Sequence, residues 1–290
     1  MTAPTLTSPV WDFEAIGTSW RIETAHPLDA ATRAEVHEAV ARFDREWSRF
    51  RDDSTVSRIA AGGAVSAPAD ADAMLSAYVE LDAATDGAVN PLVGDALARL
   101  GYDARYSLEA GDPRVTRADW RDVLTWDERM LRLSAPATID VGALGKGRLV
   151  DRVLEIVRRR HDGDVVVDAS GDLVVRGSAQ RVGLEHPYDP RRAIGVVEVQ
   201  DAALCASAVT RRAWGDGLHH VLDARTGVPV RAYAATWAVA DTAMRADALA
   251  TALFFEGGPE LAAAWGAQWV RMRTDGRLEW SPGSAAELFA

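Results

Sequence analysis

Cysteine is almost absent from this chain of 290 residues, which contains only Cys205. One thiol cannot form an intramolecular disulfide or a zinc cluster built from several thiolates, so both are excluded. The neighbouring sequence shows no sign of an activated thiolate. We therefore expect Cys205 to be buried and inert.

Long hydrophobic runs are missing as well. The longest apolar stretches, such as "ATALFF" and "DVVV", fall well short of the roughly 20 residues that a membrane-spanning helix needs. The opening residues "MTAPTLTSPVWDFEAIG" contain neither the basic nor the apolar region of a signal peptide. We expect a soluble, cytoplasmic protein without a membrane span, in which residues 1–10 form a loose tail.

Clustered positive charge is also scarce. The chain has 32 Lys and Arg against 43 Asp and Glu, a net charge of -11, and its arginines are scattered among acidic residues. Binding to nucleic acid depends on clustered cations that neutralise phosphates. The composition therefore argues against a nucleic-acid partner.

The order of the predicted elements indicates the fold class. Apolar residues at helical spacing predict one helix that begins after Asp29 and two others within residues 66–87 and 147–160. Alternating or short apolar runs predict strands around residues 11–24, 164–176 and 180–199, and a hairpin around residues 275–276. Strands and helices do not alternate regularly, so we predict an α+β fold with mixed or antiparallel sheets, formed by residues 11–290 as one domain.

The segment "DTAMRADALATALFFEG" reads as an apolar helix that carries Asp247 and Thr251 one turn apart. Residues four apart share a helix face, and a carboxylate with a hydroxyl suits Mg²⁺. Alternatively, Thr251 bonds back to the carbonyl of residue 247 while Asp247 faces solvent. The segment alone leaves both interpretations open.

A glycine-rich loop, "TIDVGALGKGRLVD", precedes a predicted helix. Its spacing matches neither the dinucleotide fingerprint nor the P-loop. Gly142, Gly145 and Gly147 would let backbone amides approach a phosphate, and Lys146 could pair with its charge. The alternative is an ordinary turn from strand to helix, capped by Asp140.

Two adjacent histidines, His219 and His220, could also contribute to a site. Neighbouring residues on a strand point to opposite faces, so at most one of them can enter a given site. In the following "LDARTGVPV", local hydrogen bonds of a turn can account for Asp223, Thr226 and Gly227.

Several segments, taken in order, resemble one known family. They are "IGTSW", "WSRFRDDSTVSRI", "GAVNPLVG", "DVGALGKGRLVD", "DASGDLVVRG", "HHVLDARTGVPV" and "ADTAMRADALATALFFEG". Each motif is modest alone, but their order and spacing between about residues 12 and 258 are similar to those of the FAD:protein FMN transferases, the ApbE flavin transferases. The resemblance implies an ApbE-like, T-fold-related fold in which FAD binds between two intimate lobes. It also implies a Mg²⁺-dependent enzyme that transfers the FMN part of FAD onto a Thr or Ser of an acceptor protein and releases AMP.

The resemblance also assigns roles to residues of this chain. It implies a magnesium site formed by Asp247, Thr251 and the main-chain carbonyl of Ala143. It places His220 as a candidate catalytic base. The implied flavin contacts are Ile16, Phe50, Ala88, Val89, Asn90, Asp140, Lys146 and Val221.

The chain departs from the family pattern at several of these contacts. The family usually has Met at Ile16, Tyr at Phe50 and Asp at Asn90, and "CASAV" lacks its customary glycine. These changes affect flavin contacts rather than the implied metal ligands. Two other activities therefore stay open: an FAD pyrophosphatase that yields FMN and AMP, and a non-catalytic flavin-binding or carrier protein. The acceptor and the oligomeric state are not specified by the sequence.

Overall fold

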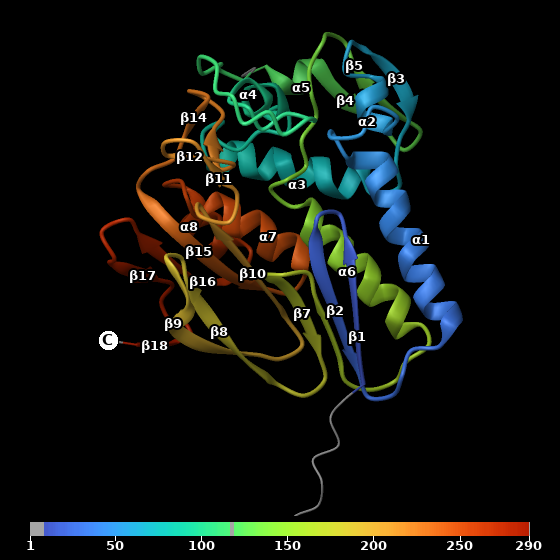
Figure 1. Ribbon diagram of the computed structural model, residues 1–290, viewed down its shortest axis with the longest axis vertical. Helices are drawn as coiled ribbons and strands as arrows, with labels where there is room; N and C mark the ends of the chain where they lie inside the picture. The colour runs from blue at the N-terminus through green and yellow to red at the C-terminus, as the bar shows by residue number, and fades with distance from the viewer. Residues whose placement is uncertain (1–8, 117–118, 290) are drawn as a thin grey trace, which may run out of the picture.

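An eight-stranded antiparallel sheet forms the centre of the molecule (Figure 1). The structure is a computed structural model that describes residues 9–116 and 119–289. The strands lie in the order β1-β2-β6-β7-β10-β15-β16-β17. Their bounds are β1 Val10–Ala15, β2 Thr18–Thr24, β6 Val165–Asp168, β7 Asp172–Arg176, β10 Ala203–Ala208, β15 Tyr233–Ala240, β16 Gln268–Arg273 and β17 Leu278–Trp280.

Helices cover one face of this sheet. Helix α7 packs on β10 and β15, helix α6 packs on β6, β7 and α7, and helix α1 packs on α6 (Figure 1). The side chain of Asp29 caps α1 by accepting a hydrogen bond from the Thr32 N–H, as its sequence predicts. The helices are α1 Ala30–Trp47, α2 Thr55–Arg58, α3 Ala71–Ala84, α4 Gly94–Arg99, α5 Trp120–Val123, α6 Gly145–Arg158, α7 Ala243–Ala252 and α8 Gly258–Ala264.

A smaller sheet covers part of the opposite face. Its strands, in the order β18-β9-β8, pack against the large sheet through a separate apolar cluster that includes Leu184, Val197 and Trp237. Because β15 is covered on both sides, its sequence is almost continuously apolar instead of alternating. These strands are β8 Gln180–His186, β9 Asp189–Val199 and β18 Glu287–Leu288.

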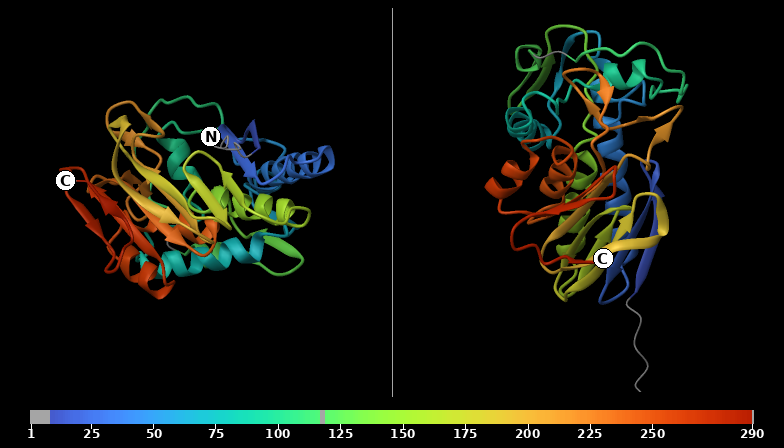
Figure 2. Two further views of the ribbon diagram at one scale, coloured as in Figure 1. Left: turned by 90° about the horizontal axis from the view of Figure 1, so that it is seen from below. Right: turned by 90° about the vertical axis from the view of Figure 1, so that its left-hand side faces the viewer.

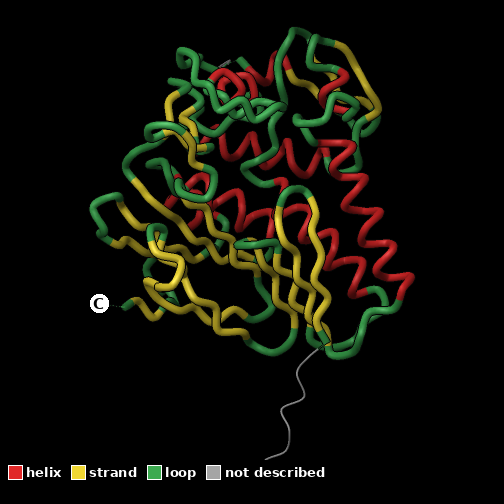
Figure 3. The backbone as a smooth tube through the Cα atoms, viewed as in Figure 1, coloured by secondary structure: helices red, strands yellow, loops and turns green. Residues whose placement is uncertain are grey.

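Short elements and loops form the upper part of the molecule in Figure 3, above the long strands and helices. Helix α3 crosses beneath them, and the right-hand view of Figure 2 shows the same separation between the loop-rich part and the sheets. A three-stranded sheet and two short hairpins belong here. Their strands are β3 Gly63–Ser66, β4 Leu124–Trp126, β5 Met130–Leu133, β11 Ala213–Trp214, β12 Leu218–His219, β13 Leu222–Asp223 and β14 Val228–Pro229.

The predicted fold class is confirmed, with corrections at element boundaries. The helix expected over residues 241–257 ends at Ala252, and α8 begins only six residues later. The sequence "HHVLDARTG", whose two histidines we treat as strand neighbours from the sequence, contains only the end of β12 and the short strand β13. Val10 already begins β1, so the predicted tail over residues 1–10 is too long, while residues 1–8 lie outside the described part. Within the described residues, no helix is both long and apolar enough to cross a membrane.

Candidate active site

Helices α6 and α7 cross in direct contact because one of the crossing residues is a glycine. A Cβ atom on Gly147 would lie 2.2 Å from the carbonyl oxygen of Ala243 and 2.7 Å from the Cβ of Asp247. The Gly147 N–H donates a hydrogen bond of 2.9 Å to Oδ2 of Asp247. The expectation that this amide faces a phosphate is therefore wrong, because Asp247 already accepts from it.

A carboxylate from α6 holds the beginning of α7. Asp151 accepts hydrogen bonds from the N–H groups of Ala243 at 2.8 Å and Met244 at 2.9 Å. The first N–H groups of a helix have no partner within the helix, and a negative charge there is favourable. Together with the Gly147 contact, this cap positions α7 and the polar residues on it.

Asp247 and Thr251 both point inward. Asp247 is only 7% exposed, and Oγ1 of Thr251 donates a hydrogen bond of 3.3 Å to the carbonyl oxygen of Ala143. The alternative of a solvent-facing Asp247, with Thr251 bonded back along its own helix, is thus wrong. The two side chains extend from α7 and contact Ala143 of the glycine-rich loop and Gly147 in the first turn of α6.

Asp172 is a second buried carboxylate beside this pair. The Nζ atom of Lys146 lies 2.9 Å from Oδ2 of Asp172 and also donates to the carbonyl of Ala169 at 2.9 Å. The contact with Asp172 is an ion pair without hydrogen-bond geometry, so neither Asp172 carboxylate oxygen accepts a hydrogen bond from a described residue. The ammonium group of Lys146 is thus the cation that is close to two buried carboxylates, Asp172 and Asp247.

The pKa values of these groups follow from their burial and charge. Burial, followed by the negative charge of Asp172, raises the pKa of Asp247 well above its usual range, although Lys146 opposes this shift. Burial would lower the pKa of Lys146, but the two carboxylates outweigh burial and raise it. The site therefore has surplus negative charge that favours an additional cation.

The donor atoms fit magnesium. A carboxylate, a hydroxyl and a carbonyl oxygen are hard ligands, and a divalent cation would offset the surplus negative charge of Asp172 and Asp247. Among residues 9–116 and 119–289, no group of three or more His, Cys, Asp or Glu side chains could hold a metal. A cation here would thus depend on Thr251 and the Ala143 carbonyl as well as on Asp247.

Two adjoining cavities surround these residues. The first has a volume of about 370 Å³ and contains the Asp247 and Thr251 side chains in its lining, and the second has a volume of about 630 Å³. Every residue to which the family resemblance assigns a role lines at least one of the two cavities. The first includes Ala88, Val89, Asn90, Ala143, His220, Val221, Asp247 and Thr251; the second includes Ile16 and Phe50; Asp140 and Lys146 line both.

The boundary between the cavities, which we call the junction, contains two cationic side chains. Lys146 and Arg212 each line both cavities, and Gly142 of the glycine-rich loop lies beside them. The residues that line both cavities are Gly17, Tyr102, Asp140, Gly142, Lys146 and Arg212.

Aromatic rings form one wall of the second cavity. The rings of Phe50 and Tyr106 are stacked with centroids 5.2 Å apart, and Tyr102 stacks on Trp214 at 5.4 Å. The guanidinium carbon of Arg49 lies 4.2 Å from the Phe50 ring centroid. Such a wall is suited to bind a flat ring system.

Asp140 connects this wall to the glycine-rich loop. Its carboxylate forms a buried ion pair with Arg49 and accepts a hydrogen bond of 2.7 Å from the Gly142 N–H. Arg49 also donates to the carbonyl of Tyr102 at 2.8 Å. The Asp140 side chain therefore fixes the loop instead of capping α6, whose N-cap residue is Leu144.

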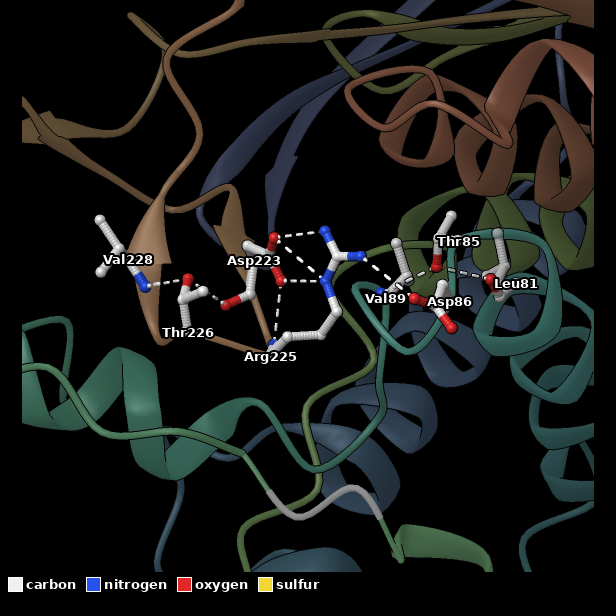
Figure 4. Close-up of polar contacts among 8 residues, drawn as sticks. All are labelled: Leu81, Thr85, Asp86, Val89, Asp223, Arg225, Thr226 and Val228. Atoms are coloured by element: carbon white, nitrogen blue, oxygen red, sulfur yellow. Dashed lines mark hydrogen bonds and ion pairs between the residues drawn. The ribbon is translucent and has the colours of Figure 1, made fainter.

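A network shown in Figure 4 supports the part of the first cavity that residues 88–90 and 221–222 line. Asp223 and Arg225 form a two-point ion pair, with Nη2 of Arg225 2.7 Å from Oδ2 of Asp223, and Arg225 also reaches Asp86 at 3.6 Å. Oγ1 of Thr85 accepts from the Val89 N–H at 3.0 Å. These contacts hold residues 88–90 beside residues 221–223, and local bonds account for the turn as expected.

The two adjacent histidines have different surroundings, although only His219 lies on a strand, because β12 ends there. His219 is buried, with Nε2 2.9 Å from the carbonyl of Val230 and Nδ1 accepting from the Val221 N–H at 3.3 Å. His220 lines the first cavity. Burial, and then the charge of Arg212, lower the pKa of His220 to about 3, so the imidazole is neutral at pH 7.

Sequence reasoning missed Asp172, Arg49 and Arg212. The first two lie inside the quoted segments "DASGD" and "WSRF", so their motifs were recognised although their roles were not. Arg212 lies between motifs, in "TRRAWG", where nothing distinguishes it from its neighbour Arg211. By contrast, Cys205 is buried, and burial raises the pKa of its thiol well above its usual range, as expected for an inert cysteine.

Comparisons with known proteins identify a matching family and similar sequences. The model of a family described as the ApbE family matches residues 16–272. An FAD:protein FMN transferase of Treponema pallidum (strain Nichols) is 29% identical over 284 residues, which cover 83% of this chain and 77% of that protein. Another, of Rhodobacter capsulatus, is 27% identical over 320 residues and matches 98% of this chain, although the match spans only 60% of that protein.

Solved structures share the fold. The flavin transferase ApbE from Vibrio cholerae superimposes with a TM-score of 0.78 at 20% identity, covering 94% of this chain and 96% of that one. The ApbE protein from Thermotoga maritima MSB8 gives a TM-score of 0.80 at 24% identity, covering 94% and 97%.

Proposed function

The chain belongs to the ApbE family, and we propose that it is an FAD:protein FMN transferase. In this proposal, the FMN part of FAD is transferred onto a Thr or Ser hydroxyl of an acceptor protein, and AMP is released. The names of the relatives from Treponema pallidum and Rhodobacter capsulatus support this activity. Residues 11–290 would act as one flavin transferase domain.

The observation that carries the proposal is the pair of cavities with a cationic junction. FAD consists of two ring systems joined by a pyrophosphate, so it needs two adjoining chambers with positive charge between them. Lys146 and Arg212 supply cationic groups to both cavities, and the aromatic wall of the second cavity suits a flat ring.

Magnesium belongs to the same proposal. Asp247, Thr251 and the carbonyl of Ala143 would hold the ion, and the surplus negative charge around Asp247 supports this assignment. When bound, Mg²⁺ would neutralise charge on the phosphates and so make the phosphorus more open to attack.

The remaining candidate residues would bind and orient FAD. Asp140 keeps Gly142 and its loop in place, and Lys146 offers its ammonium group at the junction. We propose that Ile16 and Phe50 contact FAD in the second cavity, and that residues 88–90 with Val221 do so in the first. The hydrophobic ring of Phe50 can stack as a tyrosine would, but it lacks the hydroxyl.

His220 is better suited to orient the attacking hydroxyl than to remove its proton. A general base works best with a pKa near the working pH, and the pKa of His220 is about 3. The neutral imidazole can still accept or donate a hydrogen bond within the first cavity.

A direct assay tests the proposed function. The protein is incubated with FAD, Mg²⁺ and an acceptor domain bearing a Thr or Ser target, and the products are analysed by mass spectrometry. A gain of FMN on the acceptor together with AMP supports transfer. Free FMN and AMP without labelling would instead indicate FAD hydrolysis, and tight FAD binding without turnover would indicate a carrier.

A further inference from the structure

Arg212 is a solvent-exposed cation at the junction, where it lines both cavities. No side-chain ion pair or hydrogen bond of Arg212 occurs within residues 9–116 and 119–289. Its neighbour Arg211 differs, because Nη2 of Arg211 lies 3.0 Å from a carboxylate oxygen of Glu185. The two adjacent arginines therefore have different environments despite having the same side chain.

The backbone on both sides of Arg212 is held in place. Oγ1 of Thr210 donates to the carbonyl of Pro187 at 2.8 Å, and the Arg211 N–H donates to the carbonyl of Ala208 at 3.2 Å. On the other side, Nε1 of the buried Trp214 donates to the carbonyl of Leu100 at 2.8 Å. Arg212 thus extends from an anchored segment, which limits the entropy lost when its guanidinium binds a ligand.

Other cations that line the cavities in the described part of the chain already have partners. Lys146 is paired with Asp172, Arg49 with Asp140, and Arg51 with Asp44 and Asp53. The positive charge of Arg212 extends into the site, where it contributes to lowering the pKa of His220 and opposes the rise in the pKa of Asp247. A guanidinium without a partner, at the edge of a site for phosphates, is suited to two-point binding of a phosphate group.

We propose that Arg212 is a catalytic residue that binds the phosphates of FAD and stabilises the charge of the phosphoryl group during its transfer. This inference rests on the proposed function. The acceptor oxygen forms a bond to the phosphorus of the FMN phosphate while the bond from that phosphorus to the bridging oxygen breaks. AMP leaves with the bridging oxygen, and the proton of the acceptor hydroxyl passes to solvent. Negative charge grows on the bridging oxygen, and a guanidinium at the junction would offset it.

The first measurement is equilibrium binding, which does not depend on turnover. The full chain is compared as wild type, Arg212→Gln, Arg212→Lys and the control Arg181→Gln on β8, whose arginine pairs with Glu287 away from both cavities, with circular dichroism and thermal melting to verify folding. We expect Arg212→Gln to weaken FAD binding about tenfold and to change riboflavin binding by less than about twofold, since riboflavin has no phosphate. If the substitution weakens the binding of FAD and riboflavin equally, or weakens the binding of neither, the proposed contact is overturned.

The second measurement is steady-state transfer. We expect Arg212→Gln to lower kcat by about 100-fold or more, Arg212→Lys to retain an intermediate rate, and Arg181→Gln to stay within about twofold of wild type. Added guanidinium ion should restore part of the rate to Arg212→Gln but not to wild type. If Arg212→Gln raises the KM for the acceptor and leaves kcat unchanged, Arg212 contacts the acceptor instead, and the proposal is overturned.

The two hypotheses fail in different ways. If wild type neither transfers nor hydrolyses FAD, the proposed function is wrong, while the comparison of FAD with riboflavin still decides whether Arg212 binds phosphate. If wild type transfers FMN and Arg212→Gln does so at a kcat within about threefold, the role of Arg212 is wrong and the function stands.

Discussion

Asp247 is a buried acid in a crowded electrostatic environment. It accepts a hydrogen bond from the Gly147 N–H, and it is near Asp172, with Lys146 as the compensating cation. Removing one of the two carboxylates relieves their repulsion and also removes the proposed metal ligand. The same substitution can therefore spare the fold and abolish metal binding.

We predict that Asp247→Asn retains the fold but loses metal binding. The amide oxygen can still accept from Gly147, so the metal-free variant should melt within about 2 °C of wild type, or higher, because like charges no longer face each other. The increase in melting temperature on adding Mg²⁺ and FAD should be lost, and Mg²⁺-dependent turnover should fall about 100-fold or more. Full activity in Asp247→Asn would refute the metal assignment.

His220 leads to a prediction about pH. Because the pKa of His220 is lowered to about 3, its imidazole stays neutral throughout pH 5 to 8 and cannot produce a pH-dependent limb in that range. We expect His220→Gln to reduce kcat/KM while leaving the shape of its pH profile unchanged. A limb near pH 6.5 that is present in wild type and absent in His220→Gln would show that His220 titrates as a base.

At the scale of elements, the crossing of α6 and α7 sets the site. Two features maintain this helix crossing: Gly147 has no side chain, and the Asp151 carboxylate caps the first N–H groups of α7. Because Asp247 and Lys146 lie on these two helices, a small change in their separation alters both the metal donors and the junction.

Gly147→Ala tests this dependence. The new methyl group would lie 2.2 Å from the carbonyl oxygen of Ala243, so the helices must separate, at a cost of about 1 to 3 kcal/mol in the free energy of unfolding. Denaturant unfolding should show this loss, and FAD turnover should fall because Asp247 moves. The control is Gly183→Ala in β8, where the nearest atom to an added Cβ is 3.7 Å away, and it should change stability by less than about 0.5 kcal/mol.

At the scale of the whole molecule, the site combines residues from the start of the chain to α7. Ile16 follows β1, Phe50 follows α1, and Thr251 lies near the end of α7. The cavities thus depend on the complete fold, and the metal and phosphate sites that we propose share one space. Ligands that meet in one space affect each other's affinity.

We predict that FAD and Mg²⁺ bind cooperatively. Mg²⁺ usually completes its coordination with waters and substrate phosphates, so FAD should increase Mg²⁺ affinity about tenfold, and Mg²⁺ should increase FAD affinity by the same factor. Isothermal titration calorimetry with each ligand, in the presence and absence of the other, measures both factors. Riboflavin should give no such coupling, and independent binding of FAD and Mg²⁺ would contradict a shared phosphate and metal site.

Much of the local structure could be predicted from the sequence because it depends on short-range periodicity. The stripe of Val36, Val40 and Phe43 on α1, the cap at Asp29 and the hairpin around residues 275–276 all follow from neighbouring residues. The helical spacing of Asp247 and Thr251 likewise predicts that they share a face. The order of the motifs was sufficient to indicate the ApbE family.

Only the tertiary structure decided which residues meet across the chain. The Arg49–Asp140 pair joins residues 91 positions apart, and the Gly147–Asp247 hydrogen bond joins residues 100 positions apart. No local pattern encodes such contacts. From the sequence, Gly147 is interpreted as a phosphate-binding glycine, whereas the structure shows that the position needs glycine because α7 packs closely against it. For the same reason, Arg211 and Arg212 are equivalent in sequence, and the fold alone gives one of them an acidic partner and places the other at the junction.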